Sequence, residues 1–235
     1  MGKTLLGKLA PGAVGLMELP RLAPEIMAAY RALGDLTGTV SDALDECGIA
    51  GVALLRPTDP KARMVGQAVT VLNVRRKEVS VDGKSRLGEI EAHNLAEPGD
   101  VLVVQGVAGI SSMGGISASI GKRQGESGAV VDGAVRDIAH SRDIGYPVWS
   151  SGVSPVTGKW RIQTVAVNKP VTIAGMGVHP GDLVVADECG VCFVPHARAA
   201  EVLEKARQIE QSEKLRLEKL AAGMPLAEFA ALQKK

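Results

Sequence analysis

The sequence predicts one α/β domain with helices at both ends. In the middle of the 235-residue chain, β-rich segments alternate with helical patterns, as they do in βαβ units. The 28 glycines, together with many valines and alanines, are typical of tight turns and close backbone packing. Further short strand-like segments follow, and a long charged segment of helical pattern comes last.

The first predicted helices lie near the N-terminus. The segments 23–33 (APEIMAAYRAL) and 39–47 (TVSDALDEC) have helical patterns, and Gly48 ends the second. The segment 64–74 (MVGQAVTVLNV) is rich in residues that favour strands, so it predicts the first strand of the sheet.

The middle of the chain then alternates between the two kinds of element. Pro98-Gly99 closes the first helix of this region, and Gly145 ends the last one. The predicted order is a helix within 86–100, a strand over 101–106, a helix over 114–127, a strand over 128–133 and a helix over 134–145.

The last third predicts more sheet and one long helix. The expected strands are 146–151, 167–175, 181–188 and 190–195, and the expected helix is 196–223, with Gly223 and Pro225 as stop signals. Val202, Ala206 and Ile209 share one face of that helix, which should pack on the body or on a neighbouring subunit. We expect a single domain, 1–235, with its core at roughly 35–195 and a helical extension at 196–235.

Composition excludes several classes of function. A net charge of +1 and an aromatic content of 3% give neither a basic footprint nor stacking platforms for nucleic acid. No apolar run is long enough for a membrane span or a signal segment, so we expect no membrane partner and a cytoplasmic location. Three cysteines do not form a disulfide framework, and for Cys189 and Cys192, a lone C-x-x-C, we favour a structural role over a metal or redox site.

The segment 129–137 (AVVDGAVRD) carries the main functional signal. Arg136 falls where the next helix is expected to begin, and a cation there opposes the helix dipole at a cost of about 0.3–1 kcal/mol. If the strands 101–106 and 128–133 are parallel neighbours, the glycines that follow the first and the Arg136-Asp137 pair that follows the second meet at one sheet edge. Ligands of open α/β sheets bind at that edge.

These residue types suit a small carboxylic acid and a divalent metal. Arg136 presents a planar fork to a carboxylate, and Asp137 offers a hard oxygen to Mg²⁺ or Mn²⁺. The alternative is that Arg136 and Asp137 form an exposed pair and that the glycines only make turns. His140, four residues after Arg136, is either a general acid, a group that supports the ligands, or an ordinary surface histidine.

The chain resembles a known family over roughly residues 35–195. The segments GESGAVVDGAVRDIAHSRDIGYPVWSSGVSPVTGKW, GVHPGDLVVADECGVCFVP, TVSDALDECGIAG and PGDVLVVQG carry the resemblance. They are similar to the family of the regulator of ribonuclease activity A (RraA) and the 4-hydroxy-4-methyl-2-oxoglutarate aldolases.

The resemblance implies a swivelling β/β/α fold and a homotrimer, or a dimer of trimers, with sites between subunits. It implies a divalent-metal pyruvate aldolase that also decarboxylates oxaloacetate, and hence a small keto or hydroxy acid as partner. It assigns substrate binding to Arg136 and metal binding to Asp137, both catalytic. By spacing, the remaining substrate-binding segment maps to Gly114, Gly115, Ile116 and Ser117.

The chain departs from the aldolase pattern at two positions. Gly115 stands twenty-one positions before Arg136, where the aldolases have an acid, and His140 stands where some members have another. Since a retro-aldol step must also deprotonate the leaving alcohol, we expect decarboxylation to survive these changes better than aldol cleavage. Two alternatives are an enzyme with another hydroxy or keto acid substrate and a non-catalytic, protein-binding regulator of a ribonuclease.

Overall fold

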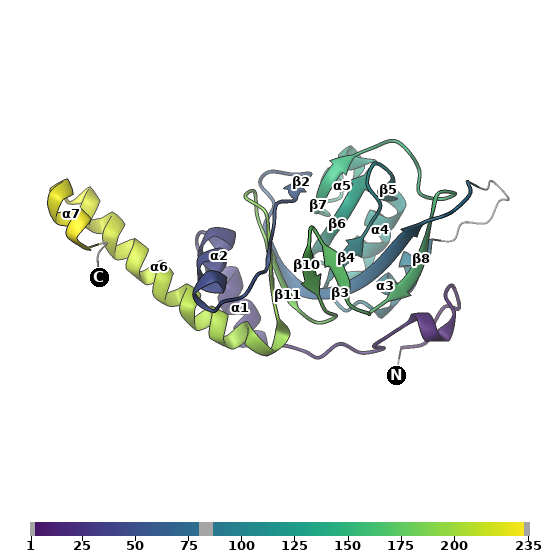
Figure 1. Cartoon of the computed structure of the whole chain (residues 1–235), viewed down its shortest axis with the longest axis horizontal. Coiled ribbons are helices and arrows are strands. Elements are labelled where there is room, and N and C mark those ends of the chain that lie inside the picture. The colour runs from purple at the N-terminus through teal and green to yellow at the C-terminus, as the bar shows by residue number, and fades with distance from the viewer. Residues whose placement is uncertain (1–2, 80–86, 233–235) are drawn as a thin grey trace.

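Four parallel strands form the centre of the fold in the computed structural model, which describes residues 3–79 and 87–232 (Figure 1). In spatial order they are β3 (Met64–Arg75), β4 (Val101–Gln105), β6 (Gly128–Val135) and β7 (Val148–Val153). Along β4, Val101 and Val103 join one hydrophobic cluster, whereas Leu102 and Val104 join another. The sheet is therefore covered on both faces, as parallel sheets normally are.

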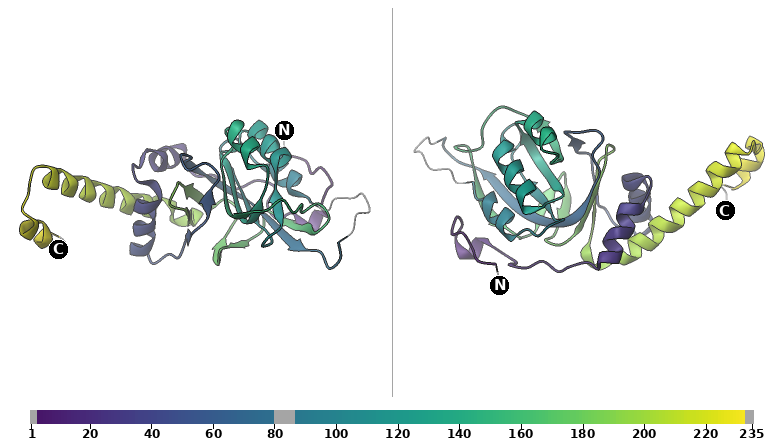
Figure 2. Two further views of the ribbon diagram at one scale, coloured as in Figure 1. Left: turned by 90° about the horizontal axis from the view of Figure 1, so that it is seen from above. Right: turned by 180° about the vertical axis from the view of Figure 1, so that it is seen from behind.

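Three helices cover one face of this sheet, and each connects two neighbouring parallel strands (Figure 2). They are α3 (Glu89–Leu95), α4 (Gly115–Gln124) and α5 (Ile138–Asp143). The alternation of strand and helix predicted for the middle of the chain is confirmed. The helix predicted within 86–100 is α3; Arg86 lies outside the described residues.

Antiparallel strands extend the sheet and cover its other face. β3 has twelve residues, so it pairs with β11 along its first part, with β4 in the middle and with β8 at its end. The remaining strands are β1 (Val52–Ala53), β2 (Arg56–Pro57), β5 (Ser111–Met113), β8 (Ile162–Val167), β9 (Val171–Ile173), β10 (Met176–Val178), β11 (Leu183–Ala186) and β12 (Val191–Val194). Trp149 and Phe193 are buried in the apolar cluster of this second layer. The mixed α/β class is confirmed.

The terminal helices pack together on a third hydrophobic cluster. They are α1 (Pro24–Ala32), α2 (Leu36–Glu46) and α6 (Ala199–Ala221), and two short 3₁₀ turns, Pro11–Ala13 and His196–Arg198, lie nearby in the chain. Val202 and Ala206 are buried and Ile209 packs against them, which confirms the predicted apolar face. The Tyr30 hydroxyl donates to the Ala199 carbonyl at 2.8 Å.

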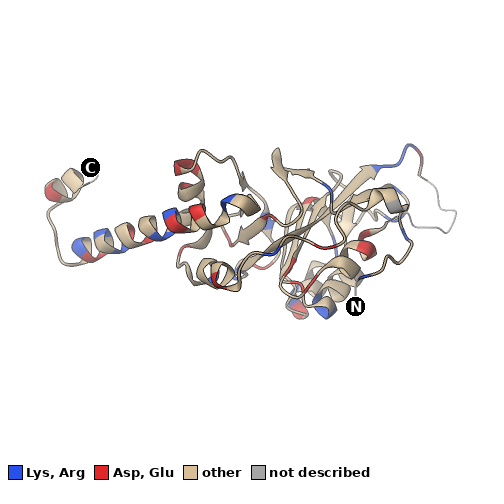
Figure 3. Ribbon diagram, turned by 90° about the horizontal axis from the view of Figure 1, so that it is seen from below, with Lys and Arg blue, Asp and Glu red and all other residues tan. Residues whose placement is uncertain are grey.

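The second half of α6 projects from the body and leads to α7 (Leu226–Leu232), which the sequence analysis did not predict (Figure 1). Lys and Arg alternate with Asp and Glu along α6 (Figure 3). None of the helices in the described ranges combines the length and the apolar character that crossing a membrane requires.

Two boundary predictions are wrong. Asp132-Gly133 does not end the strand: β6 continues to Val135, because its pairing with β7 shifts register between Val131 and Ala134 and resumes. The helix that follows begins at Ile138, so Arg136 lies before it rather than in its first turn. Arg136 and His140 therefore do not share a helix.

The segment 167–175 is also not one strand. Val167 ends β8, which the sequence analysis missed, and β9 forms a hairpin with β10. Positive φ angles at Ala174 (47°) and Gly175 (86°) make the tight turn between them.

Asp187 connects the sheet to α2. Its carboxylate accepts hydrogen bonds from the backbone N–H groups of Thr37 and Cys189, both at 2.9 Å, and from the Thr37 hydroxyl. Thr37 lies in the first turn of α2, where a negative charge is favourable. The backbone carbonyl of Asp187 also accepts the indole N–H of Trp149 at 2.7 Å.

We therefore expect Asp187→Ala to lower the free energy of unfolding by about 1–3 kcal/mol, because buried donors lose a charged partner. Urea denaturation followed by circular dichroism measures this change. Glu188→Ala, at the exposed neighbouring position, is the matched control. Equal stability of the two variants would contradict the role of Asp187 as an anchor for α2.

Candidate functional site

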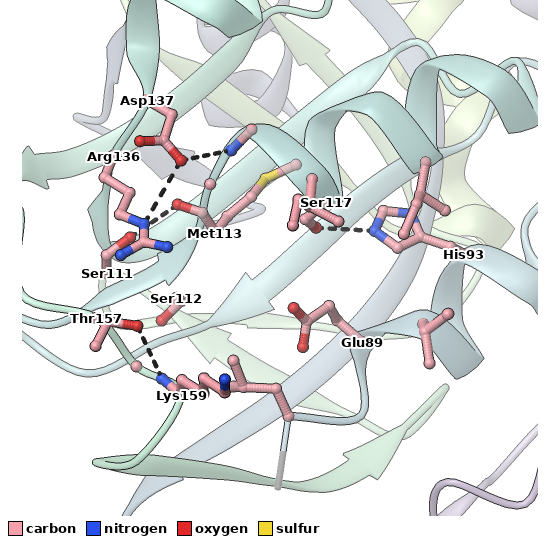
Figure 4. Close-up of a pocket in the computed structure, with 17 residues that line it drawn as sticks. Glu89, His93, Ser111, Ser112, Met113, Ser117, Arg136, Asp137, Thr157 and Lys159 are labelled. Carbon is pink, nitrogen blue, oxygen red and sulfur yellow. Dashed lines mark hydrogen bonds and ion pairs between the residues drawn. The ribbon is translucent and has the colours of Figure 1, made fainter. Parts of the chain in front are cut away.

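A cavity of about 440 Å³ opens where β5 and β6 end and α4 begins (Figure 4). Because β4 and β6 are parallel neighbours, the connections that follow them meet at one edge of the sheet, as predicted. The lining of this cavity includes six predicted site residues: Gly114, Gly115, Ile116, Ser117, Arg136 and Asp137. His140 lies in an adjoining hollow that also contains Gly115 and Asp137.

Arg136 and Asp137 form a pair that is tied to α4. Asp137 Oδ2 accepts the backbone N–H of Gly115 at 2.9 Å and lies 3.5 Å from Arg136 Nε. The two side chains are 43% and 47% exposed, so both remain accessible from the cavity. Asp137 has a φ of 55°, a left-handed conformation that costs a non-glycine residue about 1 kcal/mol or more. This backbone turn places the carboxylate at the start of α4.

The glycines leave room for this pair. A Cβ atom on Gly114 would lie 2.8 Å from Asp137 Oδ2 and 3.2 Å from Arg136 Nε. A Cβ atom on Gly115 would lie 3.0 Å from His140 Cδ2. A side chain at either position must therefore displace a site residue.

Gly115 and His140, the two departures from the aldolase pattern, lie close enough that any side chain at position 115 would meet the His140 ring. Ser119 holds His140 in place: its hydroxyl donates to the Gly115 carbonyl at 2.8 Å and lies 2.8 Å from His140 Nε2. The hydroxyl has one proton, so both bonds form together only when His140 Nε2 carries a hydrogen.

A buried polar network, which the sequence analysis missed, forms the wall between α3 and α4. His93 Nδ1 lies 2.7 Å from Glu126 Oε1, and His93 Nε2 lies 2.9 Å from the Ser117 hydroxyl. The Tyr146 hydroxyl donates to Glu126 Oε2 at 2.6 Å, and burial together with that carboxylate raises the pKa of Tyr146 well above its usual value. The network fixes the first turn of α4 against α3.

Two further titratable residues, Glu89 and Lys159, line the cavity, and the sequence analysis gave them no role. Glu89 is the first residue of α3, and Lys159 lies in the loop before β8. Figure 4 shows both on the far side of the cavity from Asp137. The sequence carries no signal for them, because their approach depends on how α3 and the loop pack against the sheet.

The donor set suits one kind of metal site. No three His, Cys, Asp or Glu side chains cluster anywhere in the described residues, so they provide no closed metal cage. Asp137 offers one carboxylate, and Mg²⁺ is commonly held by one or two carboxylates together with water and substrate. The residues present therefore fit a water-rich divalent cation at Asp137.

The C-x-x-C segment does not contribute to this cavity. Cys192 is buried in β12, where its thiol approaches the Thr37 carbonyl at 3.6 Å and burial raises its pKa to about 12. Cys189 is exposed, and both are free thiols. Cys192 is a core residue.

We expect Gly114→Ala to weaken binding of oxalate, a small dicarboxylate probe, by about tenfold, or about 1.4 kcal/mol. The added methyl group would push the Asp137 carboxylate away from its partners. Titration calorimetry in a Mg²⁺ buffer measures the affinity, and Gly177→Ala, which adds a methyl group in open space, is the control. Unchanged affinity in Gly114→Ala would contradict a need for this geometry.

Comparison with known proteins places the chain in a family. Residues 37–193 match the family model described as RraA-like, aldolase/RraA. The chain is 31% identical over 183 residues to a putative 4-hydroxy-4-methyl-2-oxoglutarate aldolase of Halalkalibacterium halodurans, which covers 77% of this chain and 82% of the relative. It is 30% identical over 191 residues to protein DlpA of Legionella pneumophila, covering 80% of this chain but only 30% of that longer protein.

A solved structure of another member of this family has a similar fold. Streptomyces coelicolor RraAS2, described as an unusual member of the RNase ES inhibitor RraA family, superimposes with a TM-score of 0.72 at 31% identity. The match covers 83% of this chain and 97% of that one. Since the family model spans more than half of the chain, the protein belongs to the RraA-like family, as the resemblance indicated.

Proposed function

We propose that the protein is a divalent-metal-dependent carbon–carbon lyase that acts on a pyruvate-type keto acid. The observation that carries the proposal is the Arg136-Asp137 pair, which the Gly115 N–H fixes at the mouth of a cavity. The relative named as a putative aldolase supports the same class of reaction. Oxaloacetate decarboxylation is the reaction that we expect first.

Arg136 binds a substrate carboxylate through its planar fork of donors. As negative charge moves onto the keto oxygen, the same guanidinium offsets it, a contribution of the oxyanion-hole type. The backbone of Gly114–Ser117 allows the substrate to approach the start of α4 closely. Ile90, Met113 and Ile120 supply apolar walls that limit water near these charges.

Asp137 would hold Mg²⁺ or Mn²⁺. When bound, the cation supplies a positive charge that polarises the keto group of the substrate. The Gly115 N–H and Arg136 hold one oxygen of the carboxylate in place, which orients Asp137 for this task.

We expect purified protein to release pyruvate from oxaloacetate with Mg²⁺ or Mn²⁺, above the spontaneous metal-catalysed rate, and to lose this turnover in EDTA. Arg136→Ala and Asp137→Ala should each lower kcat/KM by at least about 100-fold, because each removes a charge that acts on the developing enolate. A coupled assay for pyruvate measures both effects.

Matched controls separate the site from general effects of charge. Arg207→Ala on α6 and Asp143→Ala on α5 remove the same residue types at exposed positions outside the cavity. Oxaloacetate decarboxylation at the wild-type rate in both Arg136→Ala and Asp137→Ala would contradict the proposal. No turnover above background would favour the alternatives, another hydroxy or keto acid or a ribonuclease partner.

We further expect oxaloacetate decarboxylation to be faster than cleavage of 4-hydroxy-4-methyl-2-oxoglutarate. Aldol cleavage needs a base that removes the proton of the leaving alcohol. Gly115 has no side chain that could act as this base or hold it in place. Steady-state assays of pyruvate release from both substrates test this order. Faster aldol cleavage would show that another group acts as the base.

We also propose the homotrimer, or dimer of trimers, implied by the family, and a cytoplasmic location. Four exposed leucines on α6 and α7 support self-association: Leu215, Leu217, Leu220 and Leu226. The free thiols of all three cysteines suit a reducing compartment.

A further inference from the structure

Glu89 is the one carboxyl group of the cavity lining besides Asp137. It extends from the start of α3 into the cavity, on the side opposite Arg136 and Asp137 (Figure 4). A substrate bound to Arg136 would therefore lie between the guanidinium and this carboxyl group.

Glu89 carries a buried carboxyl oxygen that has no partner among the described residues. Its Oε2 atom is buried and makes no hydrogen bond, and Glu89 forms no ion pair within the described residues. Buried polar atoms almost always have a partner, so an exception in a cavity calls for a functional explanation. An uncompensated charge at this depth is costly, and the neutral, protonated form avoids that cost.

The surroundings favour the protonated acid. Burial raises the pKa of Glu89, whereas its own backbone N–H and the nearby His93 act more weakly in the opposite direction. The other charged or titratable side chains of the cavity are His93, Arg136, Asp137 and Lys159. Both ring nitrogens of His93 are engaged with Glu126 and Ser117, so His93 is not available to Glu89.

We propose that Glu89 is the proton donor that completes the lyase reaction, an assignment that rests on the proposed function. In oxaloacetate decarboxylation the bond from C3 to the departing carboxylate breaks, CO₂ leaves, and the electron pair forms the pyruvate enolate. Glu89 then transfers its carboxyl proton to C3: a C–H bond forms, and the O–H bond of Glu89 breaks. Solvent water returns a proton to the Glu89 carboxylate, which restores the starting state.

The reverse transfer gives a direct measurement. Glu89 in its ionised form should remove a proton from the methyl group of bound pyruvate, so the enzyme should exchange these hydrogens with D₂O. We expect Glu89→Gln, which keeps the shape but has no transferable proton, to slow this exchange by about 100-fold or more. Proton NMR of pyruvate in D₂O with Mg²⁺ follows the exchange. Glu25→Gln, at an exposed position on α1, is the matched control.

A second measurement needs neither metal nor substrate. In an infrared pH titration, the wild-type protein should keep a protonated carboxylic acid band to higher pH than an exposed glutamate does, and Glu89→Gln should lack this band. Circular dichroism verifies that the variant is folded.

The outcomes separate the two proposals. If the wild type decarboxylates oxaloacetate through Arg136 and Asp137 but Glu89→Gln exchanges pyruvate hydrogens at the wild-type rate, the assignment of Glu89 is overturned and the proposed function stands. If the wild type shows neither turnover nor exchange, the assignment falls together with the proposed function. Absence of the Glu89-dependent infrared band overturns the donor role whatever the activity.

Discussion

The hydrogen bond from the Gly115 N–H to the Asp137 carboxylate joins the two connections on which the site depends. One connection leads from β4 through β5 into α4, and the other leads from β6 into α5. Parallel pairing of β4 with β6 brings both to one edge, but pairing alone does not fix the side chains there. The hydrogen bond fixes the side chains. It requires the left-handed backbone of Asp137 and the absence of side chains at Gly114 and Gly115.

A buried hydrogen-bond network behind the cavity fixes the helices that form its wall. The His93, Glu126 and Tyr146 side chains are buried and hydrogen-bonded to one another, and His93 also contacts the Ser117 hydroxyl of α4, which holds α3 and α4 in a fixed relation. Buried polar networks of this kind are rigid when every member has a partner. Glu89 stands on the same helix as His93, one turn earlier, and its Oε2 atom has no hydrogen-bond partner in the part of the chain that the structure describes. The contrast within α3 distinguishes a residue that maintains the wall from one that faces the open cavity.

Much of this arrangement follows from local sequence. The alternation of β-rich and helical segments predicts βαβ units, and if β4 and β6 are parallel neighbours, as the structure shows, Gly114-Gly115 and Arg136-Asp137 must approach each other. The Asp132-Gly133 pair has the composition of a turn, but the pairing of β6 with β7 on both sides of it carries the strand past this pair. Glu89 and Lys159 could not be predicted, since no periodicity encodes how α3 and the loop before β8 pack around the cavity.

The closeness of position 115 to the His140 ring restricts the substitutions that this site can accept. With the imidazole in place, a larger residue at position 115 meets the ring at once. Replacement of His140 by a smaller residue would open the space, but it would also remove the imidazole that contacts the Ser119 hydroxyl. The two positions are therefore coupled sterically: an acid can be introduced at position 115 only if the His140 ring shifts or is replaced by a smaller side chain.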